Sequence, residues 1–172
     1  MSDVKRVAIL GAESSGKSTL AHALAFQYNT LWVPEYLREF VDIHARVPDE
    51  SDQYGIARTQ MEREDAACAK ASRFLFCDTT PLMTGVYSRW YWGRVDAQLA
   101  LLERRHDYAF TLVTALDSPW QADGLQRESE QVRQCVHALL IENLQQRAIP
   151  YLLVSGSLHQ RVLQAGRLIN PA

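Results

Sequence analysis

The chain has 172 residues, of which 47% are apolar and 22% are charged, and its formal net charge is −2. This composition fits one globular domain over residues 1–172 and excludes a strongly basic surface for nucleic acid and an apolar segment long enough to cross a membrane. The N-terminus is polar before the first apolar run, so we expect no signal peptide. Three scattered cysteines without metal-ligand spacing are typical of a cytoplasmic protein.

Short apolar runs alternate with longer helical patterns along the chain. Strands are expected at residues 7–10, 31–33, 74–77, 108–116 and 151–154. Helices are expected at residues 17–28, 54–72, 81–91, 97–104, 130–147 and 158–168. Residues 42–52 and 118–129 look irregular. Because the strands are continuous apolar runs separated by helices, the sequence predicts an α/β fold. We expect three layers, with a doubly wound, mostly parallel five-stranded sheet covered by helices on both faces.

A phosphate-binding motif follows the first expected strand. Residues 11–18 read Gly-Ala-Glu-Ser-Ser-Gly-Lys-Ser, which fits the P-loop pattern G-x-x-x-x-G-K-[ST]. Glycines allow the backbone to wrap closely around an oxyanion, and the following helix adds the positive end of its dipole. Lys17 would then bridge the β- and γ-phosphates of ATP, and the Ser18 hydroxyl would ligate Mg²⁺. The residues expected to contact the nucleotide are Gly11, Glu13, Ser14, Ser15, Gly16, Lys17, Ser18 and Thr19.

Carboxylates follow two of the neighbouring strands. Asp78 comes directly after residues 74–77 and is the candidate second ligand for Mg²⁺, although it could instead cap the following helix. Glu35 ends the second strand, where a carboxylate could orient an acceptor hydroxyl and take its proton; the alternative is a surface acid. Arg38 could balance charge in the same pocket or form a surface salt bridge. The guanine-reading motif Asn-Lys-x-Asp is absent, so these features favour a small-molecule kinase over a GTPase.

The irregular segment at residues 118–129 is a candidate lid. It contains two turn signals and is followed closely by a helix, and Arg127 and Arg133 lie where a closing lid would bring a guanidinium to the transferring phosphoryl group. The alternative is a solvated loop followed by ordinary surface arginines. We place Arg127 among the expected catalytic residues, with Lys17, Glu35 and Asp78.

Four aromatic residues gather in the expected helix at residues 81–91 and just beyond it. Tyr87 and Tyr91 are four residues apart and share a helix face, as do Tyr87 and Trp90; Trp92 follows. Such a cluster is typical of core packing or of a dimer contact. It could also form a wall for a flat, cationic ring.

The motifs together resemble a known family. The P-loop with its Glu-Ser-Ser centre, Val-Pro-Glu-Tyr-x-Arg-Glu at residues 33–39, Asp-Thr-Thr at 78–80, Pro-Trp at 119–120 and Asp-Gly at 123–124 occur in that order. In this order they resemble the ribosylnicotinamide kinase domain of the NadR-type NAD-salvage proteins, over nearly the whole chain. The P-loop alone is unspecific, whereas its combination with residues 33–39 is more specific.

The resemblance implies transfer of the γ-phosphoryl group of ATP to the 5′-hydroxyl of nicotinamide riboside, giving nicotinamide mononucleotide. It also implies that the small-molecule substrate contacts Glu35, Tyr36, Arg38, Gln60 and Asp123. The DNA-binding and adenylyltransferase activities of the multidomain relatives are not expected of this chain. The sequence leaves a homo-oligomer open.

One departure from the family concerns the substrate base. Pro34 stands where the resemblance implies an aromatic residue beside Glu35, so the residue that stacks on the base stays open between Tyr36, Trp90 and Trp92. Two alternative functions stay open as well. One is a kinase for another nucleoside or small metabolite, and the other is an ATP-dependent regulatory module in which nucleotide occupancy is sensed by a partner.

Overall fold

The computed structural model describes residues 4–122 and 129–171. Its strands are β1 (Lys5–Leu10), β2 (Leu31–Val33), β3 (Phe74–Asp78), β4 (Phe110–Thr114) and β5 (Leu152–Val154). Its α-helices are α1 (Lys17–Gln27), α2 (Tyr36–His44), α3 (Gln53–Cys68), α4 (Pro81–Trp92), α5 (Ala97–Arg105), α6 (Glu130–Gln146) and α7 (Leu158–Ile169), and a short 3₁₀ helix covers Glu50–Asp52. Every strand and helix that the sequence predicts is present, with ends shifted by a few residues.

Local chemistry sets where several helices begin and end. Pro81 occupies the first turn of α4, where its missing N–H costs nothing, and Gly93 ends that helix in the left-handed conformation at φ 67°. The Asp96 side chain caps α5 by accepting from two backbone N–H groups. Ser157 and Gln160 form a reciprocal capping box at the start of α7.

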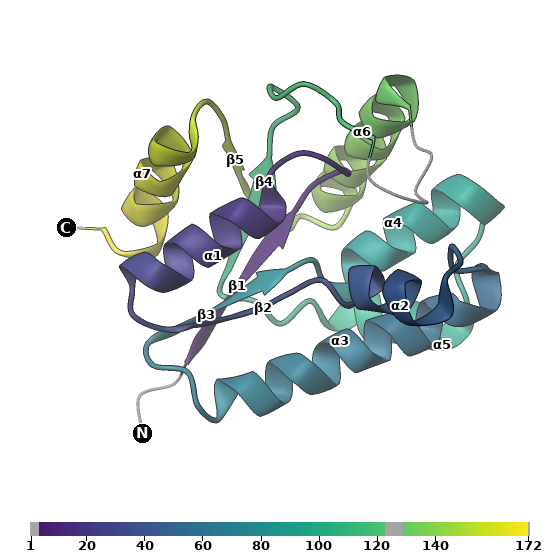
Figure 1. Cartoon of the computed structure of the whole chain (residues 1–172), viewed down its shortest axis with the longest axis horizontal. Helices are drawn as coiled ribbons and strands as arrows, with labels where there is room; N and C mark the ends of the chain where they lie inside the picture. The colour runs from purple at the N-terminus through teal and green to yellow at the C-terminus, as the bar shows by residue number, and fades with distance from the viewer. Residues whose placement is uncertain (1–3, 123–128, 172) are drawn as a thin grey trace.

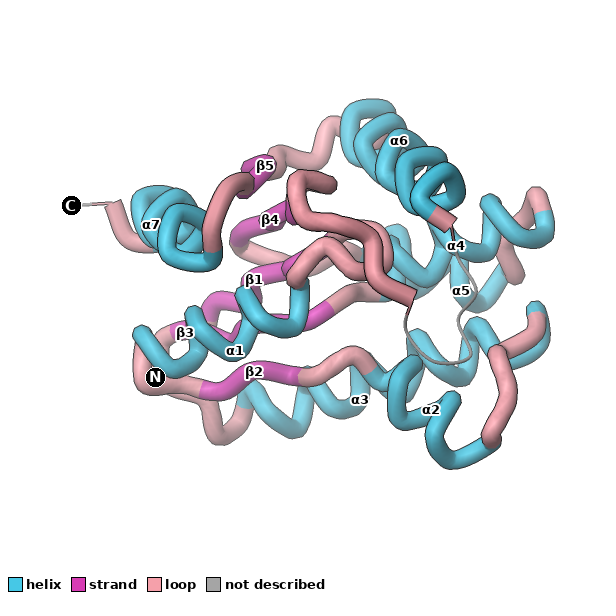
Figure 2. Tube along the Cα trace, turned by 45° about the horizontal axis from the view of Figure 1, so that its top comes forward, coloured by secondary structure: helices cyan, strands magenta, loops and turns pink. Residues whose placement is uncertain are grey.

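All five strands are parallel, in the order β2-β3-β1-β4-β5. The chain moves outward from β1 to β2, returns through β3 and then crosses to β4 on the other side of β1, so the sheet is doubly wound as expected. Figure 1 shows α1 and α7 on one face of the sheet, with α3, α4 and α6 on the other. Figure 2 shows the loops that leave β1, β2 and β4 gathered at one edge of the sheet. Ligands of such sheets bind at this carboxyl edge, where the strand order reverses.

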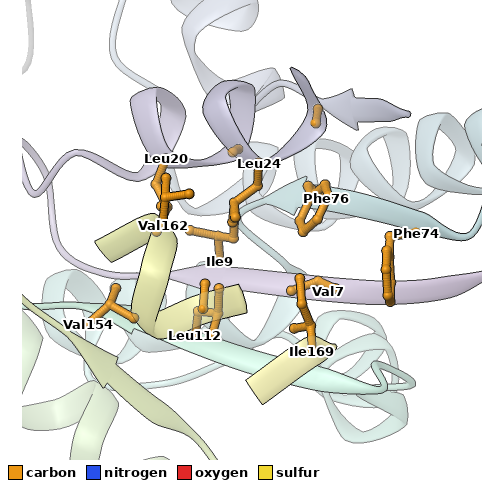
Figure 3. Packing of buried hydrophobic residues seen from close by; sticks show 13 residues of the cluster. Val7, Ile9, Leu20, Leu24, Phe74, Phe76, Leu112, Val154, Val162 and Ile169 are labelled. Carbon is orange, nitrogen blue, oxygen red and sulfur yellow. The ribbon is translucent and has the colours of Figure 1, made fainter. Parts of the chain in front are cut away.

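Alternate residues of β1 pack into two different cores. Val7 and Ile9 face α1 and α7, where they contact Leu20 and Leu24 among other buried side chains (Figure 3). Ala8 and Leu10 face α4 and α6. Because both faces of the strand are covered, a continuous apolar sequence is the pattern that this position requires. The P-loop therefore follows a strand that is held rigidly from both sides.

The helix α2 corrects one prediction. The sequence indicated an irregular segment at residues 42–52, but residues 42–44 complete α2 and residues 50–52 form the 3₁₀ helix. Phe40 is the only buried residue of α2. The helix lies against α3, where Arg63 pairs with Glu39 through two hydrogen bonds of 2.6 and 2.9 Å. Such tertiary support is absent from the local sequence pattern, which explains why α2 was missed.

Candidate nucleotide and acceptor site

The P-loop leaves β1 and enters α1 in a conformation that its glycines permit. Gly16 caps α1 with φ 86°, in the left-handed region that favours glycine. A Cβ on Gly11 would lie 2.1 Å from the Thr114 Oγ1 atom of β4, so a side chain there would collide with the neighbouring strand. Ser14 is held at φ 54°, which is uncommon for a residue with a side chain. The loop therefore adopts the compact turn that a phosphate cradle needs.

Lys17 and Ser18 begin α1 beside the end of β3. The Lys17 side chain is almost buried, and its Nζ atom donates to the Ala12 carbonyl at 3.3 Å. The Ser18 hydroxyl donates to Asp78 Oδ2 at 2.5 Å. Asp78 is fully buried, and its Oδ1 atom makes no hydrogen bond with any residue of the described chain. A hydroxyl beside a carboxylate with an unused oxygen fits Mg²⁺, which takes oxygen ligands and completes its shell with water and substrate phosphates.

Asp78 reaches this position because β1 and β3 are neighbours. Ile9 pairs with Asp78 in the parallel register, so the strand before the P-loop ends beside this carboxylate. The next residue, Thr79, has φ 74° and is anchored by its N–H to the Ile9 carbonyl at 2.9 Å. Strained, well-anchored residues of this kind cluster at functional sites.

A cavity of about 1080 Å³ extends from the P-loop. This volume slightly exceeds the upper end of the usual range for ligand pockets, and it leaves room for a nucleotide and a second small molecule. Seven consecutive P-loop and α1 residues, 13–19, line one end. The other end is lined by residues of α2, α3, α4 and the segment at residues 45–48. Residues of the segment after β4, including Ser118 and Gln121, line one side of it.

Three of the predicted acceptor-side residues line this cavity: Glu35, Arg38 and Gln60. Glu35 is the N-cap residue of α2, so the start of that helix fixes its backbone. Gln60 is buried and bridges two elements, since its Oε1 atom accepts from the Tyr36 N–H at 2.9 Å and its Nε2 atom donates to the Asp78 carbonyl at 3.4 Å. The structure thus places Glu35 and Asp78 on elements that one glutamine ties together.

Tyr36 is not among the residues that line the cavity. Its ring lies under the Arg63 guanidinium, with 4.7 Å from Cζ to the ring centroid, and only its backbone meets Gln60. Asp123 and Arg127, the other predicted lid and substrate residues, lie outside the described part of the chain. Gly11 supports the loop from behind and does not line the cavity.

The aromatic cluster divides between core and cavity. Trp90 packs against the core under α4 and α6, Tyr91 and Trp92 line the cavity, and Tyr87 does both. The rings of Tyr87 and Tyr91 are nearly parallel, with centroids 6.2 Å apart, and Tyr91 continues into Trp92 at 5.7 Å. The Tyr87 hydroxyl also accepts from the Glu13 N–H at 3.1 Å, which connects this helix to the P-loop. One aromatic wall therefore runs from the phosphate end to the acceptor end.

Sequence reasoning misplaced one arginine at this site and missed two others. Arg133 was expected as a lid residue, but it is 2% exposed and donates to the P-loop from behind, to the Ser14 carbonyl at 3.1 Å. Arg161, in α7, makes the same kind of contact with the Ser15 carbonyl and was not predicted. Arg46 lines the cavity and is held by Asp52. The local signal that could have found Arg161 is its place as a charged residue on the apolar face of an amphipathic helix.

One carboxyl group with a large pKa shift lies away from the cavity. Glu64 of α3 is fully buried under the sheet, and desolvation raises its pKa to about 7 against the opposing influence of the Tyr108 hydroxyl, 2.8 Å away, and of Arg6. Within residues 4–122 and 129–171, no three His, Cys, Asp or Glu side chains converge as a metal cluster. In the same ranges no helix is long and apolar enough to cross a membrane.

The parallel sheet, the P-loop at its carboxyl edge and the acid after the neighbouring strand define a P-loop domain of the kinase-like α/β type. A family model described as the AAA domain matches residues 6–161, and the chain belongs to this family. Over 159 residues it is 36% identical to the trifunctional NAD biosynthesis/regulator protein NadR of Salmonella typhimurium, and equally to that of Escherichia coli. The predicted resemblance to NadR-type proteins is thereby confirmed. The match covers 88% of this chain and 38% of each relative.

Solved structures share the fold over nearly the whole chain. A NadR protein in complex with NAD and AMP-PNP has a TM-score of 0.79 at 17% identity and covers 99% of this chain and 50% of its own. Thymidylate kinase from Ehrlichia chaffeensis has a TM-score of 0.71 at 13% identity, with coverage of 97% and 99%. Deoxyadenosine kinase from M. mycoides has a TM-score of 0.70 at 12% identity, with coverage of 97% and 100%. At these identities the likeness concerns the fold.

Proposed function

We propose that this chain transfers the γ-phosphoryl group of ATP to the 5′-hydroxyl of nicotinamide riboside, giving nicotinamide mononucleotide and ADP. The observation that supports this most is that one cavity is lined both by the P-loop and by Glu35, Tyr91 and Trp92. A GTPase or a simple ATPase needs no room for a second small molecule beside its nucleotide. The 36% identity to a NAD biosynthesis protein, and the likeness to a NadR structure in complex with NR, support the choice of riboside.

At the phosphate end, the backbone N–H groups of residues 13–19 would cradle the triphosphate, and Lys17 would hold the β- and γ-phosphates. Ser18 and Asp78 are the residues that would hold Mg²⁺. When bound, the ion supplies positive charge that offsets the charge on the transferring group and on the leaving ADP. Lys17 approaches the same phosphates from a nearly buried position, where its charge is weakly screened.

At the acceptor end, Glu35 would orient the riboside 5′-hydroxyl. The hydroxyl oxygen forms the new bond to the γ-phosphorus, the bond from that phosphorus to the β–γ bridging oxygen breaks, and ADP leaves with that electron pair. The hydroxyl proton passes to a carboxylate, which we take to be Glu35, since Asp78 beside Ser18 is assigned to Mg²⁺. Tyr91 and Trp92 would face the cationic nicotinamide ring, which an aromatic surface attracts.

A coupled ADP-release assay tests this proposal. The protein is given ATP and Mg²⁺ with nicotinamide riboside, uridine, cytidine, adenosine, thymidine or no acceptor, and mass spectrometry identifies any monophosphate product. ADP release confined to nicotinamide riboside is the expected result. Release with another nucleoside moves the proposal to a different substrate on the same scaffold. Release without an acceptor, or no release at all, contradicts a kinase and favours an ATPase or a regulatory module.

A further inference from the structure

Two buried arginines approach the P-loop from the side opposite the cavity. Arg133 belongs to α6 and Arg161 to α7, helices on opposite faces of the sheet (Figure 1). The two residues are 2% and 5% exposed, and neither lines the cavity. Burying a guanidinium is costly unless its donors are satisfied, so the contacts that these groups make are significant.

Both guanidinium groups donate to carbonyls of adjacent P-loop residues. Arg133 Nη1 donates to the Ser14 carbonyl at 3.1 Å, and Arg161 Nη1 donates to the Ser15 carbonyl at 2.6 Å. In a trans peptide the carbonyl of one residue points away from the N–H of the next. Arg133 therefore sets the direction of the Ser15 N–H, and Arg161 sets the direction of the Gly16 N–H. These are N–H groups of the phosphate cradle.

The same two side chains tie the P-loop to the segment after β4. Arg133 Nη2 donates to the Ser118 carbonyl at 2.8 Å. Arg161 Nη2 donates to the Ala115 carbonyl at 3.2 Å and pairs with Asp117, while its Nε atom donates to the Gly156 carbonyl at 3.1 Å. Each guanidinium is thus fixed by acceptors outside the P-loop. A rigidly held cation behind a loop can impose a conformation on that loop.

The loop needs such support because part of its backbone is unfavourable. Ser14 sits at φ 54°, a conformation that costs a residue with a side chain about 1 kcal/mol or more. The Ser14 carbonyl accepts from the Ser118 hydroxyl as well, at 3.2 Å. Oriented dipoles that are already in place contribute most to binding an anion, because no reorganisation is then needed.

We propose that Arg133 and Arg161 are positioning residues for phosphate binding, which aim the N–H groups of Ser15 and Gly16 into the cavity without touching the nucleotide. This inference rests on the proposed function only in requiring that the P-loop binds a nucleoside triphosphate. On this inference the two arginines strengthen the binding of ATP, the phosphoryl donor, and have no part in recognition of the riboside.

The test compares four variants with a matched control. Arg133→Met and Arg161→Met remove each guanidinium, and Arg133→Lys and Arg161→Lys keep a buried positive charge with fewer, differently placed donors. Arg147→Met is the control, because Arg147 also donates to a distant backbone carbonyl, that of Glu103 at 2.8 Å, at the other end of α6. Calorimetry measures the Kd of AMP-PNP with Mg²⁺, the Kd of ADP and the Kd of nicotinamide riboside, below the melting temperature of each variant.

We expect each Met variant to raise the Kd of AMP-PNP and the Kd of ADP by tenfold or more, and to change the riboside Kd less than twofold. The Lys variants should recover only part of this loss, and the control should bind AMP-PNP as the unaltered protein does. Should the Met variants fail to fold, a threefold or greater loss of AMP-PNP affinity in the Lys variants supports the same conclusion. Unchanged AMP-PNP affinity in the variants, or equal losses for AMP-PNP and riboside, would overturn the inference.

The two proposals fail separately. An unaltered protein that binds AMP-PNP but phosphorylates no riboside leaves this inference standing and removes the proposed function. If the unaltered enzyme is active and its Arg133 and Arg161 variants keep their affinity for AMP-PNP, this inference alone is refuted. An unaltered protein that binds no triphosphate removes both.

Discussion

The two ends of the cavity are built in different ways. The phosphate end comes from one stretch of chain, residues 11–19, in which backbone groups, one lysine and one serine are brought together by a single turn. The acceptor end is assembled from α2, α3, α4 and residues 45–48, which are far apart in sequence. A local motif is enough to place phosphate donors, whereas recognition of an acceptor depends on packing between elements. Changes at the two ends should therefore have separable effects.

The largest expected effect comes from the two carboxylates. Asp78→Asn should lower kcat by about 10³-fold or more and should weaken AMP-PNP binding in Mg²⁺, because it removes the charge that would hold the ion. Glu35→Gln should lower kcat by about 10²- to 10⁴-fold, the usual contribution of a general base, and leave AMP-PNP affinity nearly unchanged. Steady-state kinetics and calorimetry on the two variants check this. Equal losses of AMP-PNP affinity would refute the division of roles.

A second prediction concerns Glu64, a buried acid outside the cavity. Burial raises the pKa of Glu64 to about 7, above its ordinary value of about 4.3 in an unfolded chain. At a pH between these two pKa values, Glu64 is protonated in the folded state and ionised in the unfolded state. The free energy of unfolding therefore falls as the pH rises from about 4.5 to about 7. The integrated effect is roughly 3 kcal/mol.

Glu64→Gln should remove this dependence. Denaturant unfolding of both proteins at pH 4.5 and pH 7.5 gives the free energy of unfolding. From pH 4.5 to pH 7.5, the free energy of unfolding of the variant should rise by roughly 3 kcal/mol relative to that of the unaltered protein. The catalytic constants should hardly change, because Glu64 does not line the cavity. A constant difference in stability across this range would show that Glu64 ionises at its ordinary pKa.

Much of the phosphate end was predictable from sequence because its physics is local. The order strand, Gly-rich turn and helix specifies the P-loop, and Asp78 follows from the rule that parallel strands end at one edge. The supporting arginines were not predictable in the same way. Arg133 was expected to reach into the cavity, but its helix turns it to the back of the loop, and Arg161 lies nearly 150 residues after Ser15 in a different helix.

The acceptor end was less predictable. Glu35, Arg38 and Gln60, which the resemblance implies as substrate contacts, line the cavity, whereas Tyr36 turns its ring toward Arg63. No helix was expected at residues 36–44, because a short helix after proline with one buried side chain gives a weak signal. Which aromatic faces a ligand depends on how α4 rotates against α6, and a pattern of aromatic residues does not fix that rotation.

The aromatic wall gives a prediction of intermediate size at the acceptor end. Trp92→Ala should raise the KM for nicotinamide riboside by about tenfold, since loss of a cation–π contact in a partly desolvated site costs on the order of 1–2 kcal/mol. The KM for ATP should stay within about twofold, because the wall is separate from the phosphate cradle. Trp90→Phe is the control, since Trp90 packs in the core. A rise in both KM values for Trp92→Ala would place the residue in general support of the cavity.

The smallest effect concerns Gln60, which joins the two ends. Gln60→Leu removes the bonds to the Tyr36 N–H and the Asp78 carbonyl while filling a similar volume, so the start of α2 should lose its fixed position relative to β3. We expect a rise of about fivefold in the riboside KM, a fall of a few-fold in kcat and a loss of roughly 1–2 kcal/mol in stability, typical of two hydrogen bonds.

Gln164→Leu is the matched control for this last change. Gln164 also makes two backbone hydrogen bonds, both to Ser155, at 3.0 and 2.9 Å, and it lies far from the acceptor end. A comparable loss of stability without a change in riboside KM is expected of it. If Gln60→Leu behaves in the same way, the glutamine stabilises the fold only. If it raises the riboside KM alone, the link between α2 and β3 positions Glu35 for the acceptor, and the two ends of the cavity are coupled through one buried amide.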